Sequence, residues 1–528
     1  MTHKIGTWAF TVALGAILPA CGGGDDNAGS SPAVAQAEPV ACNAIKQRSF
    51  ANTTIASSEP VAAGSLTIGG TTLTDLPAFC RVVATISPSA DEQIGVEIWL
   101  PAQDWNGRFL GVGNGGLAGS IVYSSTTGGI GALGIADAIR KGYATASTDT
   151  GHSGNATETP NVAYPWMRSQ AKIRDWGQTS IHEMTVLAKS VATVHYGRAP
   201  DRSYFDGCST GGGQGMEEAI YYPEDYDGIH AATPGSGYAR LMSQFMSGAK
   251  VFHDNPGLGA KLGLVNAASV AACDAQDGVT DSVIENPLLC SFSPVTLQCA
   301  AGTSGPGCLT PDEVSGVQKI YAVPTNPRTG EQIYPGMAPG SESGWSLIPA
   351  LAQVVSVPLL QNMVFADVSW NYLTFDYDHD VAFVDDKVGP IITATSPDLS
   401  KFQARGGKLL MNQGWGDPFA AQTYPIEYRR KVVQSMGLSQ TDSFYRLFMV
   451  PGAGHCAGGT GPNRIDAIGT LQAWVEQGVA PDRIVATKFT DDDPAKAVVR
   501  TRPLCAWPKV ATYKGSGSTD DEASFSCS

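Results

Sequence analysis

The chain has 528 residues, of which 43% are hydrophobic and 16% charged, so it is a globular protein long enough for more than one domain. Its formal net charge of −15 argues against nucleic acid and anionic membrane surfaces as partners, because these carry the same sign of charge. No long run of Lys or Arg offsets that charge.

The N-terminal segment predicts export. Residues 5–17 are apolar and follow Lys4, a stretch too short to span a membrane but suited to a secretory signal. The segment ends in Leu-Pro-Ala-Cys21, which resembles a lipoprotein box and makes Cys21 a candidate outer-membrane lipid anchor. Cleavage after Ala-x-Ala within residues 33–37 is the alternative, giving a periplasmic or secreted protein. We assign residues 1–21 to the signal peptide and 22–41 to a flexible linker.

Strand and helix patterns alternate through residues 42–235. Apolar and polar residues alternate from Leu66 to Leu100, which predicts antiparallel strands at the edge of a sheet. Further strands are predicted at 108–112, 143–147, 202–206 and 227–232, with helices at 136–141, 178–195 and 212–222. Strands that alternate with helices imply a mostly parallel sheet.

The pattern changes after Pro234. Residues 236–397, called the lid below, are rich in Gly, Pro, Ser and Trp, contain four cysteines and show few strand–helix repeats. The alternation returns in residues 398–528, with strands at 408–411 and 444–450 and helices at 424–436 and 465–476. The predicted fold class is α/β, with a core in two parts, 42–235 and 398–528, and the lid inserted between them.

Cysteine content agrees with export. Without Cys21, ten of the eleven cysteines remain, and exported proteins keep disulfides that cytosolic proteins rarely contain. Short separations predict four pairs and leave Cys208 for Cys456; the four are Cys42–Cys80, Cys273–Cys290, Cys299–Cys308 and Cys505–Cys527. A different connectivity stays open, because sequence alone does not establish the pairing.

The segment Gly207-Cys-Ser209-Thr-Gly211 carries the strongest chemical signal. It lies between a predicted strand and a predicted helix, the setting of a G-x-S-x-G nucleophile elbow. A serine nucleophile needs an imidazole base and a carboxylate that orients it. Asp417 and His455 follow in the chain order of such hydrolases, each just beyond the end of a predicted strand. Alone, each residue is equally typical of an ordinary turn or helix cap.

Two further features accompany this triad. The oxyanion of an acyl-transfer intermediate needs N–H donors, and Thr210 and Gly116 are the candidates, although the glycine-rich loop could serve only as a tight turn. In the lid, Asp274, Asp277 and Asp281 surround a glycine at spacings suited to a structural Ca²⁺, the alternative being an acidic solvated turn.

These motifs resemble the tannase and feruloyl esterase family of α/β-hydrolases, from about Cys42 to Cys527. The matching segments are GCSTGG (207–212), CDAQDG (273–278), FMVPGAGHC (448–456), WNGR (105–108) and AVVRTRPLC (497–505), together with Asp417. The resemblance implies that a disulfide joins the nucleophile and histidine loops. It also implies a lid Ca²⁺ bound by Asp274, Asp277 and Asp281 with backbone oxygens of Val279 and Val283.

The family's substrates are esters of aromatic acids, so the expected partner is a small aromatic ester; the sequence does not give the oligomeric state. Trp415 and Phe419 flank Asp417 and are the predicted pocket residues, whereas the lid aromatics are equally typical of lid core. The family's terephthalate half-ester hydrolase uses a lid arginine to hold the free carboxylate, and residues 345–387 contain none.

We therefore expect an exported serine esterase for feruloyl, galloyl or related esters. The alternatives are a mono(2-hydroxyethyl) terephthalate-type hydrolase, a surface lipoprotein that binds aromatic esters with weak catalysis, a hydrolase whose calcium polarises the carbonyl, and a peptidase.

Overall fold

A nine-stranded sheet organises the structure, a computed structural model that describes residues 38–125, 131–154 and 157–528. In spatial order its strands are β1 (Thr53–Val61), β4 (Phe79–Ile86), β5 (Ile94–Pro101), β7 (Ala144–Thr148), β6 (Arg108–Val112), β8 (Arg202–Cys208), β9 (Gly228–Ala232), β10 (Lys408–Gly414) and β11 (Tyr445–Val450). The pairs from β1 to β7 are antiparallel, and those from β7 to β11 are parallel. This is an α/β-hydrolase sheet, as predicted.

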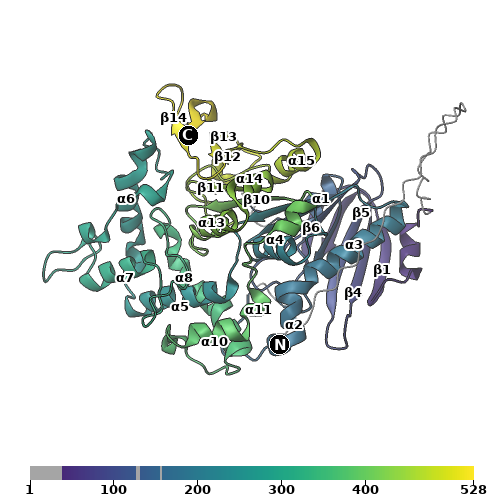
Figure 1. Ribbon diagram of the computed structural model, residues 1–528, viewed down its shortest axis with the longest axis horizontal. Helices are drawn as coiled ribbons and strands as arrows, with labels where there is room; N and C mark the ends of the chain where they lie inside the picture. Colours follow the sequence, from purple (N-terminus) through teal and green to yellow (C-terminus); the bar gives the residue numbers. More distant parts are fainter. Residues whose placement is uncertain (1–37, 126–130, 155–156) are drawn as a thin grey trace, which may run out of the picture. The chain divides into compact units, whose positions relative to one another are not determined.

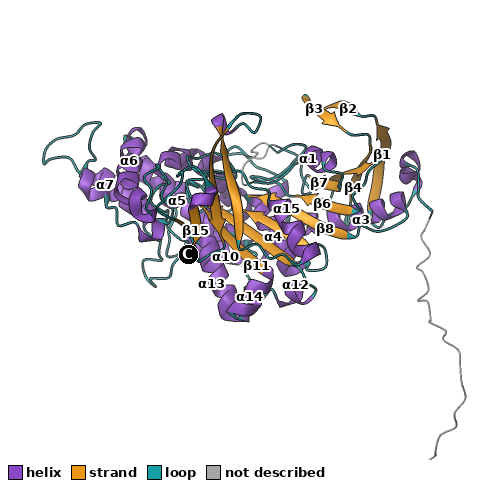
Figure 2. Ribbon diagram, turned by 90° about the horizontal axis from the view of Figure 1, so that it is seen from above, coloured by secondary structure: helices purple, strands orange, loops and turns teal. Residues whose placement is uncertain are grey.

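Helices cover both faces of this sheet (Figures 1 and 2). Because side chains alternate along a strand, Phe205 and Leu409 pack on one face, and their neighbours Tyr204 and Leu410 on the other. The helices of the core are α1 (Ile135–Arg140), α2 (Gln170–Arg174), α3 (Ser180–Tyr196), α4 (Thr210–Tyr221), α13 (Tyr424–Met436), α14 (Leu438–Phe444) and α15 (Ala467–Gln477). Residues of α3, α4 and α13 bury on the Phe205 face, and residues of α1 and α15 on the Tyr204 face.

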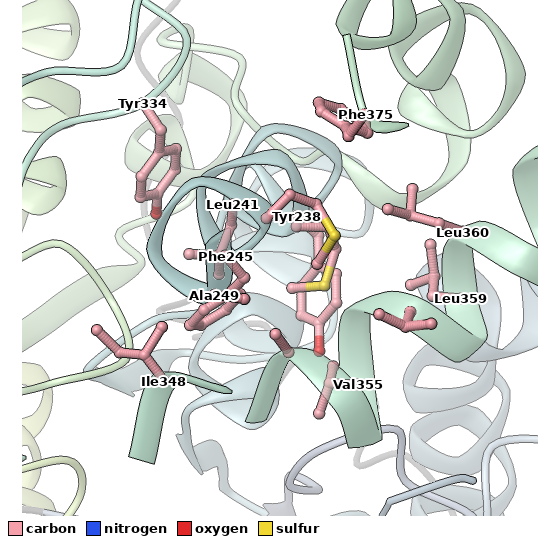
Figure 3. Packing of buried hydrophobic residues seen from close by; sticks show 14 of the residues in the cluster. Tyr238, Leu241, Phe245, Ala249, Tyr334, Ile348, Val355, Leu359, Leu360 and Phe375 are labelled. Carbon is pink, nitrogen blue, oxygen red and sulfur yellow. The ribbon is translucent and has the colours of Figure 1, made fainter. Parts of the chain in front are cut away.

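The chain between β9 and β10 is helical, and its buried residues form a hydrophobic cluster, called the lid core below, that also includes Leu117, Trp166 and Trp176 (Figure 3). Its helices are α5 (Tyr238–Asp254), α6 (Leu262–Cys273), α7 (Pro311–Tyr321), α8 (Ile348–Leu351), α9 (Val357–Leu359), α10 (Asp380–Lys387), α11 (Gly389–Ile392) and α12 (Ser400–Ala404). The helical stretch Glu342–Val364 is long and apolar enough to cross a membrane, but 67% of its apolar window is buried inside the protein, as in a core helix. Residues 38–528 form one compact unit, and the predicted lid boundaries stay a prediction.

Three two-stranded sheets lie outside the main sheet. They are β2 (Gly64–Ile68) with β3 (Thr71–Leu76), β12 (Arg483–Phe489) with β13 (Val498–Cys505), and β14 (Ala511–Tyr513) with β15 (Phe525–Cys527). β2 and β3 lie in the segment where antiparallel strands are predicted, and they pair with each other, not with an edge strand of the main sheet. They form a separate hairpin whose turn, Gly69-Gly70, has positive φ at both residues, as tight hairpins require.

Five disulfides connect the described chain, and they are the five expected pairs. They are Cys42–Cys80, Cys208–Cys456, Cys273–Cys290, Cys299–Cys308 and Cys505–Cys527. Such a set is typical of an exported protein. The predicted signal peptide and Cys21 lie outside the described residues, so the lipid anchor stays a prediction.

Candidate active site

Ser209 lies in the sharp turn between β8 and α4. Its backbone has φ 61° and ψ −122°, a conformation that a non-glycine residue adopts only under strain. The flanking glycines allow the turn: a Cβ on Gly207 would lie 2.2 Å from the Gly211 carbonyl oxygen, and one on Gly211 would lie 2.7 Å from that of Asn114. The structure thus gives Ser209 the strand–turn–helix setting of a nucleophile elbow.

Asp417 and His455 are joined by a hydrogen bond. Nδ1 of His455 lies 2.8 Å from Oδ2 of Asp417, whose side chain is fully buried in the turn after β10. The carboxylate also accepts hydrogen bonds from Gln413 Nε2 at 3.0 Å, Phe419 N at 2.8 Å and Ala420 N at 3.1 Å. With its orientation fixed from four sides, Asp417 holds Nδ1 of the imidazole and leaves Nε2 for chemistry.

The Cys208–Cys456 disulfide brings the serine and histidine loops together. Each cysteine is the chain neighbour of a candidate catalytic residue, and their Cα atoms are 6.0 Å apart. Ser209 and His455 line the same cavity. Within the described residues no hydrogen bond joins Ser209 Oγ to His455, an arrangement common before substrate binds.

The two predicted oxyanion donors, Thr210 and Gly116, line the same cavity as Ser209. Thr210 is the first residue of α4, and Gly116 lies in the loop after β6. In the part of the chain that the structure describes, neither backbone N–H donates to another protein atom. Both donors are therefore available to an oxygen in the cavity.

The cavity that contains Ser209, called the Ser209 cavity below, has a volume of about 590 Å³, within the usual range for small-molecule sites. Most residues of the segment 113–125, which belongs to the core, form one wall of this cavity. The lid forms an apolar wall, which consists of Tyr238, Leu241, Met242, Phe245, Leu351 and Val355. Among the described residues that line it, there is no Asp, Glu, Lys or Arg. The cavity therefore suits an uncharged, largely apolar ligand. Figure 3 shows several lid residues of this wall within the lid core.

The two predicted pocket residues have different positions. Phe419 lines the Ser209 cavity, and its ring meets the His455 ring edge-on, with centroids 5.0 Å apart. The prediction for Trp415 is wrong, because this side chain is buried in the core and borders a separate cavity of about 70 Å³. The backbone N–H of Trp415 donates to Val450 O, which continues the alternation of β10 and places the Trp415 ring in the same core cluster as Met411.

Five lid aromatics form core, as their alternative interpretation held. They belong to the lid core or pack against it and do not line the Ser209 cavity: Trp345, Phe365, Trp370, Tyr372 and Phe375. The apolar lining instead comes largely from α5, which sequence reasoning missed. Tyr238, Leu241, Met242 and Phe245 recur at three- and four-residue intervals, so the periodicity of an amphipathic helix could have found them.

The acidic lid loop gathers its three aspartates. Asp274 accepts hydrogen bonds from the N–H groups of Asp281 and Ser282, and Asp281 pairs with Arg500 and Arg502. Burial raises the pKa of Asp277 and Asp281, and the charges of neighbouring aspartates raise it further.

Carboxylate and carbonyl oxygens, the donors that Ca²⁺ prefers, are both present in this loop. Besides the carboxylates, the carbonyl oxygens of Val279 and Val283 accept no hydrogen bond within the described chain. In those same residues, however, no group of three or more His, Cys, Asp or Glu side chains is arranged to hold a metal. A calcium site in this loop therefore stays a prediction.

Comparison with known proteins identifies the family. The model of the family "Tannase and feruloyl esterase" matches residues 80–528. The chain belongs to this family. It is therefore a carboxylic ester hydrolase, as predicted.

Individual relatives agree. An uncharacterized esterase of Xanthomonas campestris pv. campestris is 37% identical, over 92% of this chain and 91% of that protein. The mono(2-hydroxyethyl) terephthalate hydrolase of Piscinibacter sakaiensis is 32% identical, over 86% of this chain and 85% of that protein. The crystal structure of feruloyl esterase B from Aspergillus oryzae superposes with a TM-score of 0.83 at 29% identity, covering 92% of this chain and 99% of that one.

Proposed function

We propose that this esterase hydrolyses neutral esters of aromatic carboxylic acids through an acyl-enzyme on Ser209. The observation that most supports this is the His455–Asp417 hydrogen bond at the edge of the Ser209 cavity. A histidine oriented by a buried carboxylate beside a serine on a strained turn is the arrangement that activates a hydroxyl.

In the proposed reaction, Ser209 Oγ turns toward His455 and loses its proton to Nε2 as it attacks the ester carbonyl carbon. The N–H groups of Thr210 and Gly116 donate to the resulting oxyanion. When the intermediate collapses, His455 gives the proton to the leaving alcohol. Water then attacks the acyl-enzyme with His455 again as base, and the acid leaves while Ser209 regains its proton.

The lining of the Ser209 cavity supports the substrate class. Its lid wall is apolar, and an aromatic acyl group buries more apolar surface there than a short aliphatic one. Without a lining Lys or Arg, a substrate carboxylate would lose its hydration with no cation in exchange. This favours feruloyl or galloyl esters over a terephthalate half-ester, although one relative acts on such a half-ester.

A substrate panel tests the proposal. It contains methyl ferulate, methyl gallate, chlorogenate and mono(2-hydroxyethyl) terephthalate, with Ser209→Ala in parallel. We expect turnover of the neutral methyl esters by the wild type and loss of about 10³-fold or more in the variant, which keeps its melting temperature. A matched pair isolates charge: monomethyl terephthalate, which carries a carboxylate, and methyl 4-carbamoylbenzoate, a neutral amide of similar shape.

The outcomes separate the alternatives. Equal rates in Ser209→Ala would overturn the mechanism, and equal kcat/KM for the matched pair would overturn the charge preference. No turnover by folded wild-type protein would favour a protein that binds esters without hydrolysing them.

We also propose that the acidic lid loop binds a structural Ca²⁺ through Asp274, Asp277, Asp281 and the carbonyls of Val279 and Val283. When bound, the ion would neutralise the crowded carboxylates and fix the loop. None of these residues lines the Ser209 cavity, so the ion has no part in the proposed chemistry.

A further inference from the structure

We propose that the side-chain hydroxyl of Thr210 is a positioning group, which holds the Gly116 loop in the conformation that receives the oxyanion. This inference rests on the proposed function, because it concerns the rate of that reaction. It assigns a role to the Thr210 side chain, separate from that of its backbone N–H.

The central observation is one short hydrogen bond between two loops. Thr210 Oγ1 donates to the carbonyl oxygen of Gly116 at 2.6 Å, and the Thr210 side chain is buried. The bond therefore connects the first residue of α4 with the loop after β6, the two segments that carry the proposed oxyanion donors. The Gly116 carbonyl belongs to the peptide group shared with Leu117, and the Gly116 N–H belongs to the peptide group before it, so the bond restrains the proposed donor through the backbone of Gly116.

Gly116 needs such a restraint. It has φ 57°, in the left-handed region, and the turn around it is closed by one hydrogen bond, from Ala118 N to Gly115 O at 2.9 Å. Glycine has more backbone conformations available than any other residue, so a turn built on Gly115-Gly116 has little stiffness of its own. The Thr210 hydroxyl supplies a bond from outside the turn.

The start of the same loop is held by different groups. Gly211 N donates to Asn114 O at 2.7 Å, and Gln214 Oε1 accepts from Asn114 N at 2.9 Å. These bonds fix Asn114 but do not reach Gly116. The Thr210 side chain, by contrast, bonds directly to Gly116, the residue that carries the proposed donor.

Tyr238 adds a weaker contact from the lid. Its hydroxyl lies 3.4 Å from Thr210 Oγ1 and 3.5 Å from Gly116 O, and its ring meets Trp176 edge-on at 5.3 Å. Burial raises the pKa of Tyr238 to about 12, so the hydroxyl stays a donor at neutral pH. Because these distances are long, we assign the principal restraint to Thr210.

The simpler interpretation is that the Thr210 hydroxyl bonds Gly116 merely because a buried hydroxyl needs a partner. Two variants distinguish the interpretations. Thr210→Val has nearly the same shape and keeps the backbone N–H but loses the hydroxyl, whereas Thr210→Ser keeps the hydroxyl. Ser209-dependent turnover of methyl ferulate by the wild type, in the same assay, establishes the proposed function independently.

We expect kcat of Thr210→Val to fall about tenfold, less than the 10²–10³-fold typical of deleting an oxyanion donor, with little change in KM. Thr210→Ser should restore most of the rate. An arylboronic acid that adds to Ser209 should lose affinity for Thr210→Val in proportion to kcat, while inhibition by the product acid should not change.

Two results would overturn the inference. One is Thr210→Val with the wild-type kcat, and the other is Thr210→Ser impaired as strongly as Thr210→Val. If Thr210→Val is too unstable to purify, Thr210→Ala and Thr210→Ser decide, because both lack the methyl group and only Thr210→Ser has the hydroxyl: equal kcat in these two variants would overturn the inference.

Discussion

Ser209 illustrates how a strained residue is held in place. A backbone conformation such as φ 61° costs about 1–3 kcal/mol and persists only where its surroundings determine it. Here Ser209 N donates to Ala232 O at 3.1 Å, and Ser209 O accepts from Gly213 N at 3.1 Å and Gly235 N at 2.8 Å. Both polar groups of the serine backbone are therefore satisfied in the strained state, and the side chain remains free for chemistry.

Glu218, on helix α4 after Ser209, is a buried acidic residue. Glu218 is 1% exposed, and its carboxyl group lies beside that of Asp225. Burial raises the pKa of Glu218 well above 4.5, and the nearby Asp225 raises it further. The folded protein thus keeps a proton that the unfolded chain loses above pH 4.5.

We expect Glu218→Gln to raise the melting temperature at pH 7.5 but not at pH 4. The wild type loses up to about 1.4 kcal/mol of stability per pH unit as the pH rises from the unfolded pKa to the folded pKa, and an amide does not titrate. Calorimetry at both pH values measures the difference. Exposed Glu224→Gln is the control for charge alone, and an equal pH-dependent gain in that variant would contradict the assignment to burial.

At the scale of single residues, the sequence predicted the candidate catalytic residues better than it predicted where neighbouring side chains point. Ser209, Asp417 and His455 could be found because a triad needs particular residue types in a particular order. Trp415 could not be placed, because a neighbour of a catalytic residue points into the cavity or the core according to the strand's register. That register depends on pairing between β10 and β11, which no local pattern specifies.

At the scale of elements, the β8–α4 turn carries Ser209 and the loop after β11 carries His455, so the proposed mechanism needs a fixed distance between the two. They are 248 residues apart in the chain, and the Cys208–Cys456 disulfide connects them. Thr233, in the turn after β9, contributes a hydroxyl 2.7 Å from Cys208 Sγ and 3.4 Å from Cys456 Sγ. We therefore expect the bond to position Ser209 relative to His455, besides its effect on unfolding.

We predict that the double variant Cys208→Ala/Cys456→Ala lowers kcat at least tenfold at a temperature where it is folded. Chain entropy also predicts a loss of ~5 kcal/mol in stability for so long a loop, so circular dichroism must establish folding before the rates are compared. Cys299→Ala/Cys308→Ala, which opens a lid disulfide, is the matched control and should keep the wild-type kcat. Equal kcat in both double variants would remove the positional role.

The elements that the sequence revealed are those with regular burial. Strands β6 to β11 are buried almost throughout, so their apolar runs between helices stand out. β1 was missed because only Ile55 and Ser58 of its nine residues are buried and it contains Pro60. β13 likewise contains Pro503, which argues against a strand in a sequence pattern.

For the whole molecule, the acidic lid loop connects distant parts of the chain. Asp281 pairs with Arg500 and Arg502, both of which belong to β13. These arginines lie 219 and 221 residues after Asp281 in the sequence. Val279 also packs with Cys505, Ala511 and Phe525 of the C-terminal segment. An ion that fixed this loop would therefore stabilise the contact between the lid and the end of the chain, rather than the Ser209 cavity.

Ca²⁺ should consequently raise the melting temperature of chelator-treated protein and leave kcat unchanged where both forms are folded. Binding to the folded state alone contributes about 2.7 kcal/mol when free Ca²⁺ is a hundred times Kd. Asp277→Asn should abolish this gain, while Asp312→Asn, which removes an exposed lid carboxylate, should keep it. If calcium left the melting temperature unchanged, the loop would be an acidic turn held by Arg500 and Arg502. If chelation removed activity from a protein with an intact fold, the ion would belong to the chemistry, and the mechanism built on Ser209, His455 and Asp417 would be incomplete.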